Sequence, residues 1–303
     1  MEILVTGASG FLGREVCREL AARGHSVVAL VRRPGSEPPG TRAVLADLRD
    51  EVGLAAALRR AEPECVVHLA AETGVQRDRR AVADVNVEGT RRLIGAAVDA
   101  GVRRCLFAST VVTGDAKGAL LTEESELPVD TAYGRSKQEG ERMMRAAPFE
   151  SVIVRPSHVY GPGGWFASQL VRRLCAPGRL VVAGRGDNWW DVVHVADAAS
   201  AVGDVLERAP AGALYHVVDD EPITQYDFAA LAARALGCGP PRRVPALLAR
   251  TLIGSDPLRA AVRSARSSNA RITGELGWAL RFPSAREGVP AAVAALEAGG
   301  PDP

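Results

Sequence analysis

The chain has 303 residues, and its 37 basic and 36 acidic side chains give a formal net charge of +1. This balance excludes a protein that grips nucleic-acid phosphates, because such proteins carry a clustered basic excess. The hydrophobic fraction of 47% is ordinary for a globular protein, and the length suggests two domains or one two-lobed unit. Glycine is enriched at 31 residues without any repeat, so we expect the excess in turns and ligand loops.

The cysteines are odd in number and none has metal-type spacing, so no metal site is expected. Cys17, Cys65 and Cys105 lie inside apolar patterns and are expected in the core, as in a reducing compartment. No signal-peptide core follows Met1, and no apolar run approaches the roughly 20 residues that cross a bilayer. These features predict a cytoplasmic protein without membrane contact.

Short apolar runs alternate with longer amphipathic stretches in the first half of the chain. This alternation predicts a parallel sheet covered by helices on both faces, which is a doubly wound α/β fold. Strands are expected over residues 3–5, 27–31, 42–46, 65–69, 104–108 and 151–154, and helices over 12–20, 54–61, 80–100 and 132–146.

The pattern loosens after Gly161, where residues 162–164 and 184–186 read as turns. A strand running into a helix is expected over 193–206 and one more strand over 214–218, and the chain from Pro222 onward is expected to be mainly helical. This predicts a larger domain of residues 1–160, to which residues 187–218 return. Residues 161–186 and 219–303 would form a smaller lobe.

A glycine-rich turn joins the first strand to the first helix, with glycines spaced G-x-x-G-x-x-G. In a Rossmann-type domain such a turn makes room for a pyrophosphate, and the free N–H groups of the helix N-terminus bind it. The alternative is a turn without a ligand, but the position after an N-terminal strand favours a dinucleotide. The expected contacts are Gly7, Ser9, Gly10, Phe11, Leu12 and Gly13.

The end of the second strand bears on the choice of cofactor. NAD sites usually place a carboxylate here to hold the ribose, whereas this chain has Arg32 and Arg33. Guanidinium groups suit a 2′-phosphate, so we favour NADP(H), with NAD(H) as the alternative if both arginines are merely solvated. Asp47 and Leu48, after the third strand, are candidate adenine contacts, unless Asp47 only caps a helix.

Tyr133 and Lys137 are four residues apart, so on a helix they share one face. A tyrosine hydroxyl has a pKa of about 10, and a nearby ammonium and an oxidised nicotinamide would both lower it toward the range useful for proton transfer. Tyr133 would then exchange a proton with a carbonyl or alcohol oxygen. Ser109 follows the fifth strand and would hydrogen-bond that oxygen, and Thr110 is a rival for the role.

These motifs, taken together, resemble the extended short-chain dehydrogenase/reductase family, the NAD(P)-dependent sugar epimerase/dehydratase group. The resemblance runs almost from end to end, through residues 6–13, 68–71, 86–90, 109–114, 133–137, 155–162, 193–195 and 276–278. It implies that Ser109, Tyr133 and Lys137 are catalytic.

The resemblance also implies roles beyond this triad. Asn86 would support Lys137 through water, and Asp197 would help to close the lobes. The cofactor would be lined by Leu69, Ala70 and Ala71 and approached by Pro156 and His158 near the nicotinamide. A homodimer joined by the helices 80–100 and 132–146 would be usual.

Several positions depart from the family pattern. The sugar 4,6-dehydratases carry an Asp-Glu pair where this chain has Thr110 and Val111, and Val111 cannot exchange a proton, so dehydration of that type is not expected. Thr113 stands where many epimerases have an aromatic residue. His158 stands where nucleotide-sugar enzymes often have asparagine, and it either titrates near neutral pH or is simply packed.

Candidate substrate residues in the smaller lobe rest on weaker signals. Trp165 and Phe166 follow a glycine-rich turn and would form a substrate wall, with core packing as an equal alternative. The pair Trp189-Trp190 is expected to be mainly structural. Arg185, Arg243 and Arg271 would meet a diphosphate unless they are solvated, and Thr110 would contact the substrate.

The sequence therefore predicts an NADP(H)-dependent reductase or dehydrogenase that acts on a carbonyl/hydroxyl pair of a small molecule. A nucleotide-linked sugar is one candidate substrate. One alternative is a nucleotide-sugar epimerase that keeps its NAD bound. Another, from a different class, is a dinucleotide-binding regulator without catalysis, against which the Tyr133 and Lys137 pair argues.

Overall fold

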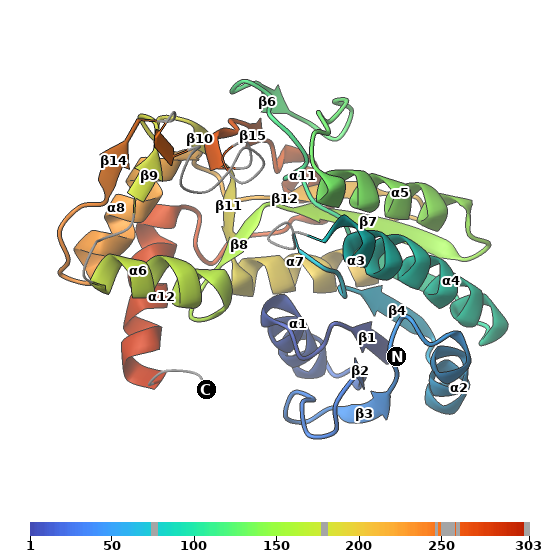
Figure 1. Cartoon of the computed structure of the whole chain (residues 1–303). Coiled ribbons are helices and arrows are strands. Elements are labelled where there is room, and N and C mark those ends of the chain that lie inside the picture. Colours follow the sequence, from blue (N-terminus) through green and yellow to red (C-terminus); the bar gives the residue numbers. More distant parts are fainter. Residues whose placement is uncertain (74–77, 177–180, 246–247, 250–257, 259–260, 300–303) are drawn as a thin grey trace.

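The protein, described from a computed structural model covering residues 1–73, 78–176, 181–245, 248–249, 258 and 261–299, is built on a seven-stranded parallel sheet (Figure 1). The strand order is β12-β7-β5-β4-β1-β2-β3, so the order reverses beside β1, as in a doubly wound fold. The strands are β1 (Glu2–Thr6), β2 (Ser26–Val31), β3 (Arg42–Leu45), β4 (Cys65–His68), β5 (Arg104–Ala108), β7 (Glu150–Pro156) and β12 (Leu214–Val217).

Helices cover both faces of this sheet, because neighbouring strand residues point to opposite sides and are buried on each. Ile3 and Val5 pack under α1 (Phe11–Ala22) and α7 (Val195–Arg208). Leu4, between them, packs under the second layer. That layer consists of α2 (Glu51–Ala61), α4 (Gly89–Asp99) and α5 (Ala132–Ala146). Cys17, Cys65 and Cys105 are buried, as predicted.

The helix expected over residues 80–100 is divided into three parts. It consists of α3 (Arg79–Ala83), a π-helical turn η1 (Asp84–Glu88) and α4. The π turn carries Asn86, whose carbonyl accepts a hydrogen bond of 2.7 Å from the Thr90 hydroxyl. Apolar periodicity could not reveal this insertion, because a single π turn changes the helical phase without removing the amphipathic pattern.

A smaller body lies beside the carboxyl ends of the strands and surrounds its own hydrophobic cluster, which includes Tyr160, Phe166 and Phe228 (Figure 1). It contains the π-helical η2 (Phe166–Val171), α6 (Arg172–Cys175), α8 (Gln225–Ala235) and α12 (Ala285–Gly299). Helix α11 (Ala270–Leu276) instead packs on β12 and α7, where Ile272 and Leu276 join the core of the large sheet. The second half is less purely helical than expected. Short strand pairs join β8 (His158–Tyr160) to β11 (Val192–His194), β9 (Val181–Ala183) to β14 (Arg242–Val244), β10 (Trp189–Trp190) to β13 (Ile223–Thr224), and β6 (Leu120–Leu121) to β15 (Arg266–Ser267).

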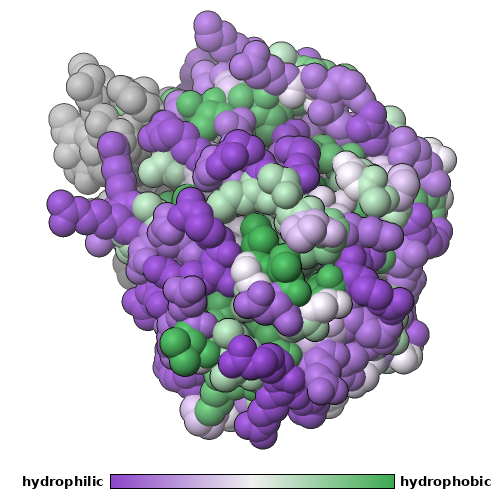
Figure 2. All heavy atoms as spheres, turned by 90° about the vertical axis from the view of Figure 1, so that its right-hand side faces the viewer, coloured by the Kyte–Doolittle hydropathy of each residue, from purple (hydrophilic) through white to green (hydrophobic). Residues whose placement is uncertain are grey.

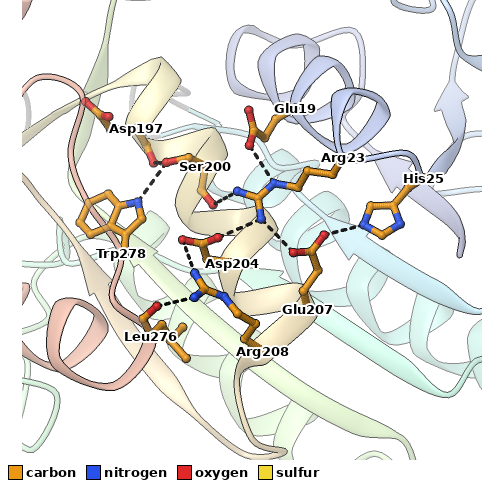
Figure 3. Close-up of polar contacts among 10 residues, drawn as sticks. All are labelled: Glu19, Arg23, His25, Asp197, Ser200, Asp204, Glu207, Arg208, Leu276 and Trp278. Atoms are coloured by element: carbon orange, nitrogen blue, oxygen red, sulfur yellow. Dashed lines mark hydrogen bonds and ion pairs between the residues drawn. The ribbon is translucent and has the colours of Figure 1, made fainter.

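Polar contacts fasten α7 to its neighbours on both sides (Figure 3). The Arg23 guanidinium donates hydrogen bonds of 2.8 Å to Asp204 and 2.9 Å to Glu207, and lies across Gly203, where a Cβ would come within 2.5 Å of its Cζ. Asp197 accepts hydrogen bonds from the backbone N–H groups of Arg281 and Phe282 at 2.6 and 3.1 Å. Asp197 therefore does join α7 to the segment that leads into α12.

Candidate functional site

The glycine-rich turn is packed so closely that side chains would not fit at two of its positions. Gly7 has a φ of +70°, and a Cβ there would lie 2.8 Å from the Ala70 N atom. A Cβ on Gly13 would lie 2.0 Å from the Gly7 carbonyl oxygen. At Gly10 the nearest atom would be 3.1 Å away. Gly7 and Gly13 thus allow the turn to pack tightly against the loop after β4 and against itself, whereas Gly10 is exposed.

Helix α1 begins at this exposed glycine with features that suit an anion. Its N-cap residue, Gly10, has no side chain to bond the first N–H groups, and the first turn carries no acidic residue. In contrast, α2 is capped by Asp50 and α5 by Thr131. The uncapped N–H groups and the positive end of the helix dipole favour a phosphate at α1.

Phe11 couples this turn to the smaller body. Its ring lies beneath the Gly161–Gly164 turn: a Cβ on Gly163 would lie 3.2 Å from the nearest ring carbon, and one on Gly164 would lie 2.8 Å from its nearest ring carbon. Both glycines have positive φ values, of +151° and +54°. The turn that the sequence marks between the two parts is therefore a close contact against the glycine loop.

Arg32 and Arg33 lie exposed just after β2, at the same edge of the sheet as the glycine loop. Asp47 lies near them: hydrogen bonds from Arg49, its main partner, and the charge of Arg32 lower the pKa of Asp47 to about 2. Leu48 is buried against α4: a Cβ added to Gly89, the first residue of that helix, would lie 2.9 Å from the Cβ of Leu48. A basic pair therefore stands next to an ionised carboxylate already paired with Arg49.

A buried chain of hydrogen bonds runs below the glycine loop from β1 to η1. The Nδ1 atom of His68 lies 2.7 Å from the Thr6 hydroxyl, and its Nε2 atom lies 2.9 Å from the Thr90 hydroxyl. Thr90 donates to the Asn86 carbonyl, so it accepts from His68, which must carry its proton on Nε2. Burial lowers the pKa of His68 to about 3, so the ring is neutral. Sequence motifs point to residues 68–71, but not to this role of His68 and Thr90.

Asn86 extends this chain to the helix that carries the candidate catalytic residues. It is 2% exposed, and its amide nitrogen donates to the Ser136 hydroxyl at 3.0 Å and to the Glu72 carbonyl at 2.9 Å. Its amide oxygen accepts the Glu72 N–H at 2.7 Å. Ser136 in turn donates to the Tyr133 carbonyl at 2.8 Å. Asn86 thus ties the loop after β4 to the first turn of α5.

Helix α5 is pressed onto the sheet at glycines on either side of Lys137. A Cβ on Gly134 would lie 2.8 Å from the Thr113 carbonyl oxygen, and one on Gly140 would lie 2.5 Å from the Phe107 ring. This close packing carries the Lys137 Nζ to 2.7 Å from the Ala108 carbonyl, which accepts its hydrogen bond. Nζ also lies 5.9 Å from the centre of the Tyr133 ring.

Burial shifts the titration of both members of this pair. It lowers the pKa of Lys137 to about 8, although the Glu141 carboxylate opposes the shift. It raises the pKa of Tyr133 to about 12. In the protein alone, desolvation therefore outweighs the attraction of Lys137 for a phenolate. The lowering expected from Lys137 together with an oxidised nicotinamide stays a prediction.

Ser109 lies in a buried polar cluster rather than in an open site. It is 4% exposed and is level with Arg155 on β7, which lies beside His216 on β12. Arg155 binds the Glu141 carboxylate through bonds of 2.7 and 2.8 Å. Although burial opposes it, Arg155 and the nearby Ser109 hydroxyl hold the pKa of Glu141 below its usual value. The Ser109 hydroxyl makes no full hydrogen bond to any described atom.

Thr110, the rival of Ser109, is tied to the strand that leads to His158. Its hydroxyl donates to the Pro156 carbonyl at 3.0 Å and accepts the Val112 N–H at 2.9 Å. Ser109 and Thr110 occupy consecutive positions, so their side chains leave the chain in different directions, and only Ser109 shares the Glu141 and Arg155 cluster.

His158 faces aromatic side chains of the smaller body. Its ring stacks on Trp190 with 4.6 Å between centroids, and the Trp165 ring lies 6.4 Å away, edge on. The Trp165 indole N–H donates to the Val159 carbonyl at 2.7 Å. Burial lowers the pKa of His158 to about 3, so it does not titrate near neutral pH. Phe166 is fully buried, which makes it a core residue rather than part of a substrate wall.

The other arginines suggested for a diphosphate already have partners at the surface. The Arg185 side chain is 89% exposed and pairs with Asp187 at 2.9 Å. The Arg243 guanidinium lies 3.6 Å from the centre of the Tyr226 ring, and Arg271 pairs with Glu124. No described contact links these arginines with Tyr133 or Lys137. Among the residues that the structure describes, no group of three or more metal-ligating side chains is assembled.

Residues 3–218, well over half of the chain, match the NAD dependent epimerase/dehydratase family. The chain belongs to this family. A 3-diazoavenalumate denitrifying reductase from a Streptomyces species is 34% identical over 95% of this chain and 99% of that protein. A 2-alkyl-3-oxoalkanoate reductase of Stenotrophomonas maltophilia is 31% identical over 78% of this chain and 76% of that protein.

Solved structures of this family have the same fold. MoeE5 in complex with UDP-glucuronic acid and NAD is similar with a TM-score of 0.84 and 27% identity, covering 99% of this chain and 100% of that one. DesIV, a dTDP-glucose 4,6-dehydratase from Streptomyces venezuelae with NAD and TYD bound, gives a TM-score of 0.84 and 28% identity over 98% of this chain and 97% of that one. As a member of this family, the protein is an NAD(P)-dependent enzyme of the oxidoreductase and epimerase type, with the predicted Rossmann fold.

The residues present fit such a dinucleotide. The uncapped N-terminus of α1 suits the pyrophosphate, and the tight packing at Gly7 and Gly13 keeps that end free of side chains. Lys137, buried and held by the Ala108 carbonyl, lies where the strands end. The fit rests on these features of the chain itself, independently of any relative.

Proposed function

We propose that the protein is an NADP(H)-dependent reductase or dehydrogenase that acts on a carbonyl/hydroxyl pair of a small molecule. The observation that carries the proposal is the arrangement of Tyr133 and Lys137 on α5, with Nζ held by the Ala108 carbonyl and 5.9 Å from the Tyr133 ring. The nicotinamide supplies or accepts the hydride. The Streptomyces and Stenotrophomonas relatives, both named as reductases, support reduction over epimerisation.

In this proposal Tyr133 exchanges the proton on the substrate oxygen. During reduction its hydroxyl donates that proton, and its pKa of about 12 in the protein alone keeps it protonated beforehand. Lys137 stabilises the phenolate that remains and holds the nicotinamide ribose. Asn86 keeps the first turn of α5 in position through Ser136, which bonds the Tyr133 carbonyl.

One of two neighbouring hydroxyls would orient the substrate oxygen. We retain the triad of Ser109, Tyr133 and Lys137 as the proposal that the sequence suggests. Thr110 stays the alternative, although its hydroxyl already donates to the Pro156 carbonyl and accepts the Val112 N–H, whereas the Ser109 hydroxyl has no full hydrogen-bond partner among the described residues. Ser109→Ala and Thr110→Val distinguish them, because loss of the orienting hydroxyl lowers kcat/KM by roughly 10- to 100-fold, whereas the other change has a smaller effect.

The cofactor preference rests on Arg32 and Arg33, which we propose bind the 2′-phosphate of NADP(H). Their exposure leaves both guanidinium groups accessible, and the Asp47 carboxylate nearby is engaged by Arg49. The remaining predicted contacts with the dinucleotide are Ser9, Gly10, Leu12, Asp47, Leu48, Leu69, Ala70, Ala71, Pro156 and His158.

We further propose that the protein is a cytoplasmic homodimer joined through α4 and α5. Figure 2 looks onto the right-hand side of Figure 1, and apolar side chains there form an interrupted group among hydrophilic ones. Val98, at the end of α4, is 41% exposed. Sedimentation equilibrium tests the assembly, and a monomer at micromolar concentration would contradict it. Among the described residues, no helix has the length and apolar character needed to span a bilayer.

A screen for NADPH consumption with simple ketones and nucleotide sugars tests the proposed reaction. Turnover of any of them that the Tyr133→Phe variant loses supports the proposal. Turnover that this variant retains contradicts the role of Tyr133. Interconversion of nucleotide sugars without net NADPH consumption, by protein that holds NAD through dialysis, would instead identify an epimerase. Tight NADPH binding with no turnover of either class would favour a regulator.

A further inference from the structure

Arg263 is a buried cation with two nitrogen atoms that lack hydrogen-bond partners among the described residues. Its residue is 4% exposed, and its Nε and Nη1 atoms have no hydrogen-bond partner in the part of the chain that the structure describes. A guanidinium carries five donors and stays charged at any physiological pH. Because an unpaired buried charge is costly, a protein that retains one usually has a use for it.

The backbone around Arg263 is fixed by other groups, so its guanidinium is not needed for that purpose. The Asn188 side chain donates to the Arg263 carbonyl at 2.9 Å. The next residue, Ser264, donates its N–H to Asp115 at 2.9 Å, and its hydroxyl accepts the Trp189 N–H at 3.0 Å. These bonds hold the segment beside residues 188–189. The Nε and Nη1 atoms of the Arg263 guanidinium take no part in them and have no hydrogen-bond partner among the described residues.

The segment that carries Arg263 adjoins the aromatic residues around His158. Arg263 and Ser264 are bonded to Asn188 and Trp189, and the next residue, Trp190, packs its ring on His158. The charge of Arg263 also contributes, after burial, to the lowered pKa of His158. His158 stacks on Trp190 at 4.6 Å and faces Trp165. It also follows Pro156, whose carbonyl is bonded to the Thr110 hydroxyl. The segment of Arg263 therefore lies beside the group of aromatic rings around His158.

The carboxylates around Arg263 do not satisfy it. Asp115 and Asp130 are exposed, so solvent screens their charges. Asp191 is buried, but its two oxygens already accept the Ser267 N–H at 2.9 Å and the Ser267 hydroxyl at 2.7 Å. These groups favour the charged form of Arg263 without forming a described hydrogen bond to it. Donors therefore remain for a ligand.

We propose that Arg263 binds an oxyanion of the substrate, and that this oxyanion is a carboxylate on a small carbonyl compound with a flat, unsaturated body. A guanidinium fork matches a carboxylate through two parallel hydrogen bonds. The rings of His158, Trp165 and Trp190 would pack against the flat body. The inference rests on the proposed reductase function and names its substrate class. A nucleotide diphosphate is the other source of such an oxyanion.

Calorimetry on the full-length protein saturated with NADP⁺ tests this proposal. The probes are para-acetylbenzoate, its neutral amide para-acetylbenzamide, and UDP. We expect the wild type to bind the acid roughly 10- to 100-fold more tightly than the amide, as one charge-assisted hydrogen-bonded pair would give. Arg263→Gln should abolish this preference, and Arg263→Lys should restore part of it. Arg286→Gln, which removes a 73% exposed guanidinium in the same body, should leave the preference intact.

Three results would overturn the proposal. One is a wild type that does not bind the acid at millimolar concentration, and another is an acid preference that survives in Arg263→Gln. The third is UDP binding that Arg263→Gln loses while the affinity for the acid is unchanged, which assigns the guanidinium to a diphosphate. These readouts require no turnover. If Arg263→Gln loses the acid preference while Tyr133→Phe keeps its turnover, the proposed function is refuted and the role of Arg263 is supported.

Thermal unfolding separates this role from a purely structural one. If Arg263 is kept for a ligand, Arg263→Met should raise the melting temperature of the ligand-free protein, because it removes an unsatisfied buried charge. It should also abolish the stabilisation that para-acetylbenzoate gives the wild type. A lowered melting temperature with an unchanged response to the acid would mean that Arg263 only stabilises the fold.

Discussion

Two buried polar regions flank the candidate site and differ in how their hydrogen bonds are completed. Below the glycine loop, Thr6, His68, Thr90 and Asn86 form a chain in which both nitrogens of His68 have partners. On the side of the smaller body, two Arg263 donors and the Trp190 indole N–H lack partners among the described residues.

This difference in hydrogen bonding suggests different roles for the two regions, one in binding the cofactor and the other in binding the substrate. The chain around His68 fixes the ends of β1 and β4 and the start of α5 without help from a ligand, as a site for a shared cofactor requires. The region around Arg263 carries polar groups that the fold itself does not satisfy, as expected where a particular substrate supplies the partners. The predictions below test each side.

The largest effect is expected for Tyr133→Phe, which removes the proposed proton donor. Turnover should fall by about 10²- to 10⁴-fold, because general acid catalysis is lost, while the affinity for NADPH stays within a few fold. Steady-state kinetics and calorimetry measure the two quantities. Tyr226→Phe, in which the ring beneath Arg243 loses only its hydroxyl, is the control and should keep wild-type turnover.

Replacing Arg32 and Arg33 by glutamate should invert the cofactor preference. Two guanidinium groups that bind a 2′-phosphate would be exchanged for carboxylates that repel it, so NADPH should bind roughly 10- to 100-fold more weakly. NADH should be little affected or improved. Arg60→Glu, an exposed change at the end of α2, is the matched control. A double variant that still prefers NADPH would exclude both arginines as determinants.

Gly13→Ala should disrupt the glycine loop far more than Gly10→Ala. The new methyl group would lie 2.0 Å from the Gly7 carbonyl oxygen in the first variant and 3.1 Å from it in the second. Overpacking of this kind costs about 1–3 kcal/mol or more of folding free energy, and displacement of the loop should weaken NADPH binding as well. Urea unfolding and calorimetry measure both. Equal losses in the two variants would contradict the packing argument.

Thr90→Val tests the completed chain around His68. The isosteric change leaves the Nε2–H group of a buried histidine without an acceptor, so we expect a loss of about 1–3 kcal/mol in the free energy of unfolding. Thr41→Val is the control, because the Thr41 hydroxyl bonds the Pro38 carbonyl in a partly exposed turn. Equal, small effects of both changes would show that the chain contributes no special stability.

The activity of the wild type should decline as the pH rises above about 8. Burial depresses the pKa of Lys137 to about 8, so the ammonium is present below that pH and is lost above it. Loss of its charge removes the group that stabilises the Tyr133 phenolate, and kcat/KM should fall several-fold. In Lys137→Arg the decline should move to higher pH. A profile flat from pH 7 to 10 would contradict this role.

Much of the sheet region could be predicted from the sequence, because its apolar runs are buried on both faces and its glycines punctuate the turns. The limits predicted for α5, residues 132–146, agree with Ala132–Ala146. The strand pairs of the second half could not be predicted. β8, for example, has three residues and owes its conformation to pairing with β11, more than 30 positions later in the chain.

The site could be predicted where residue type and spacing carry the chemistry, as for Tyr133 and Lys137. It could not where burial decides the role. Nothing in the sequence distinguishes Arg263 from the exposed Arg185, yet only one of them is buried with unpaired donors. Likewise, the separation of Ser109 from Thr110 depends on the contacts of Glu141 and Arg155, which lie far away in the chain.

The central claim, a reductase that uses a dissociable NADP(H), is tested most directly by the cofactor affinities of the purified wild-type protein. After extensive dialysis the protein should carry no dinucleotide, and calorimetric titration should give a lower Kd for NADPH than for NADH. Protein that retains NAD through dialysis, or that binds NADH more tightly than NADPH, would contradict the account.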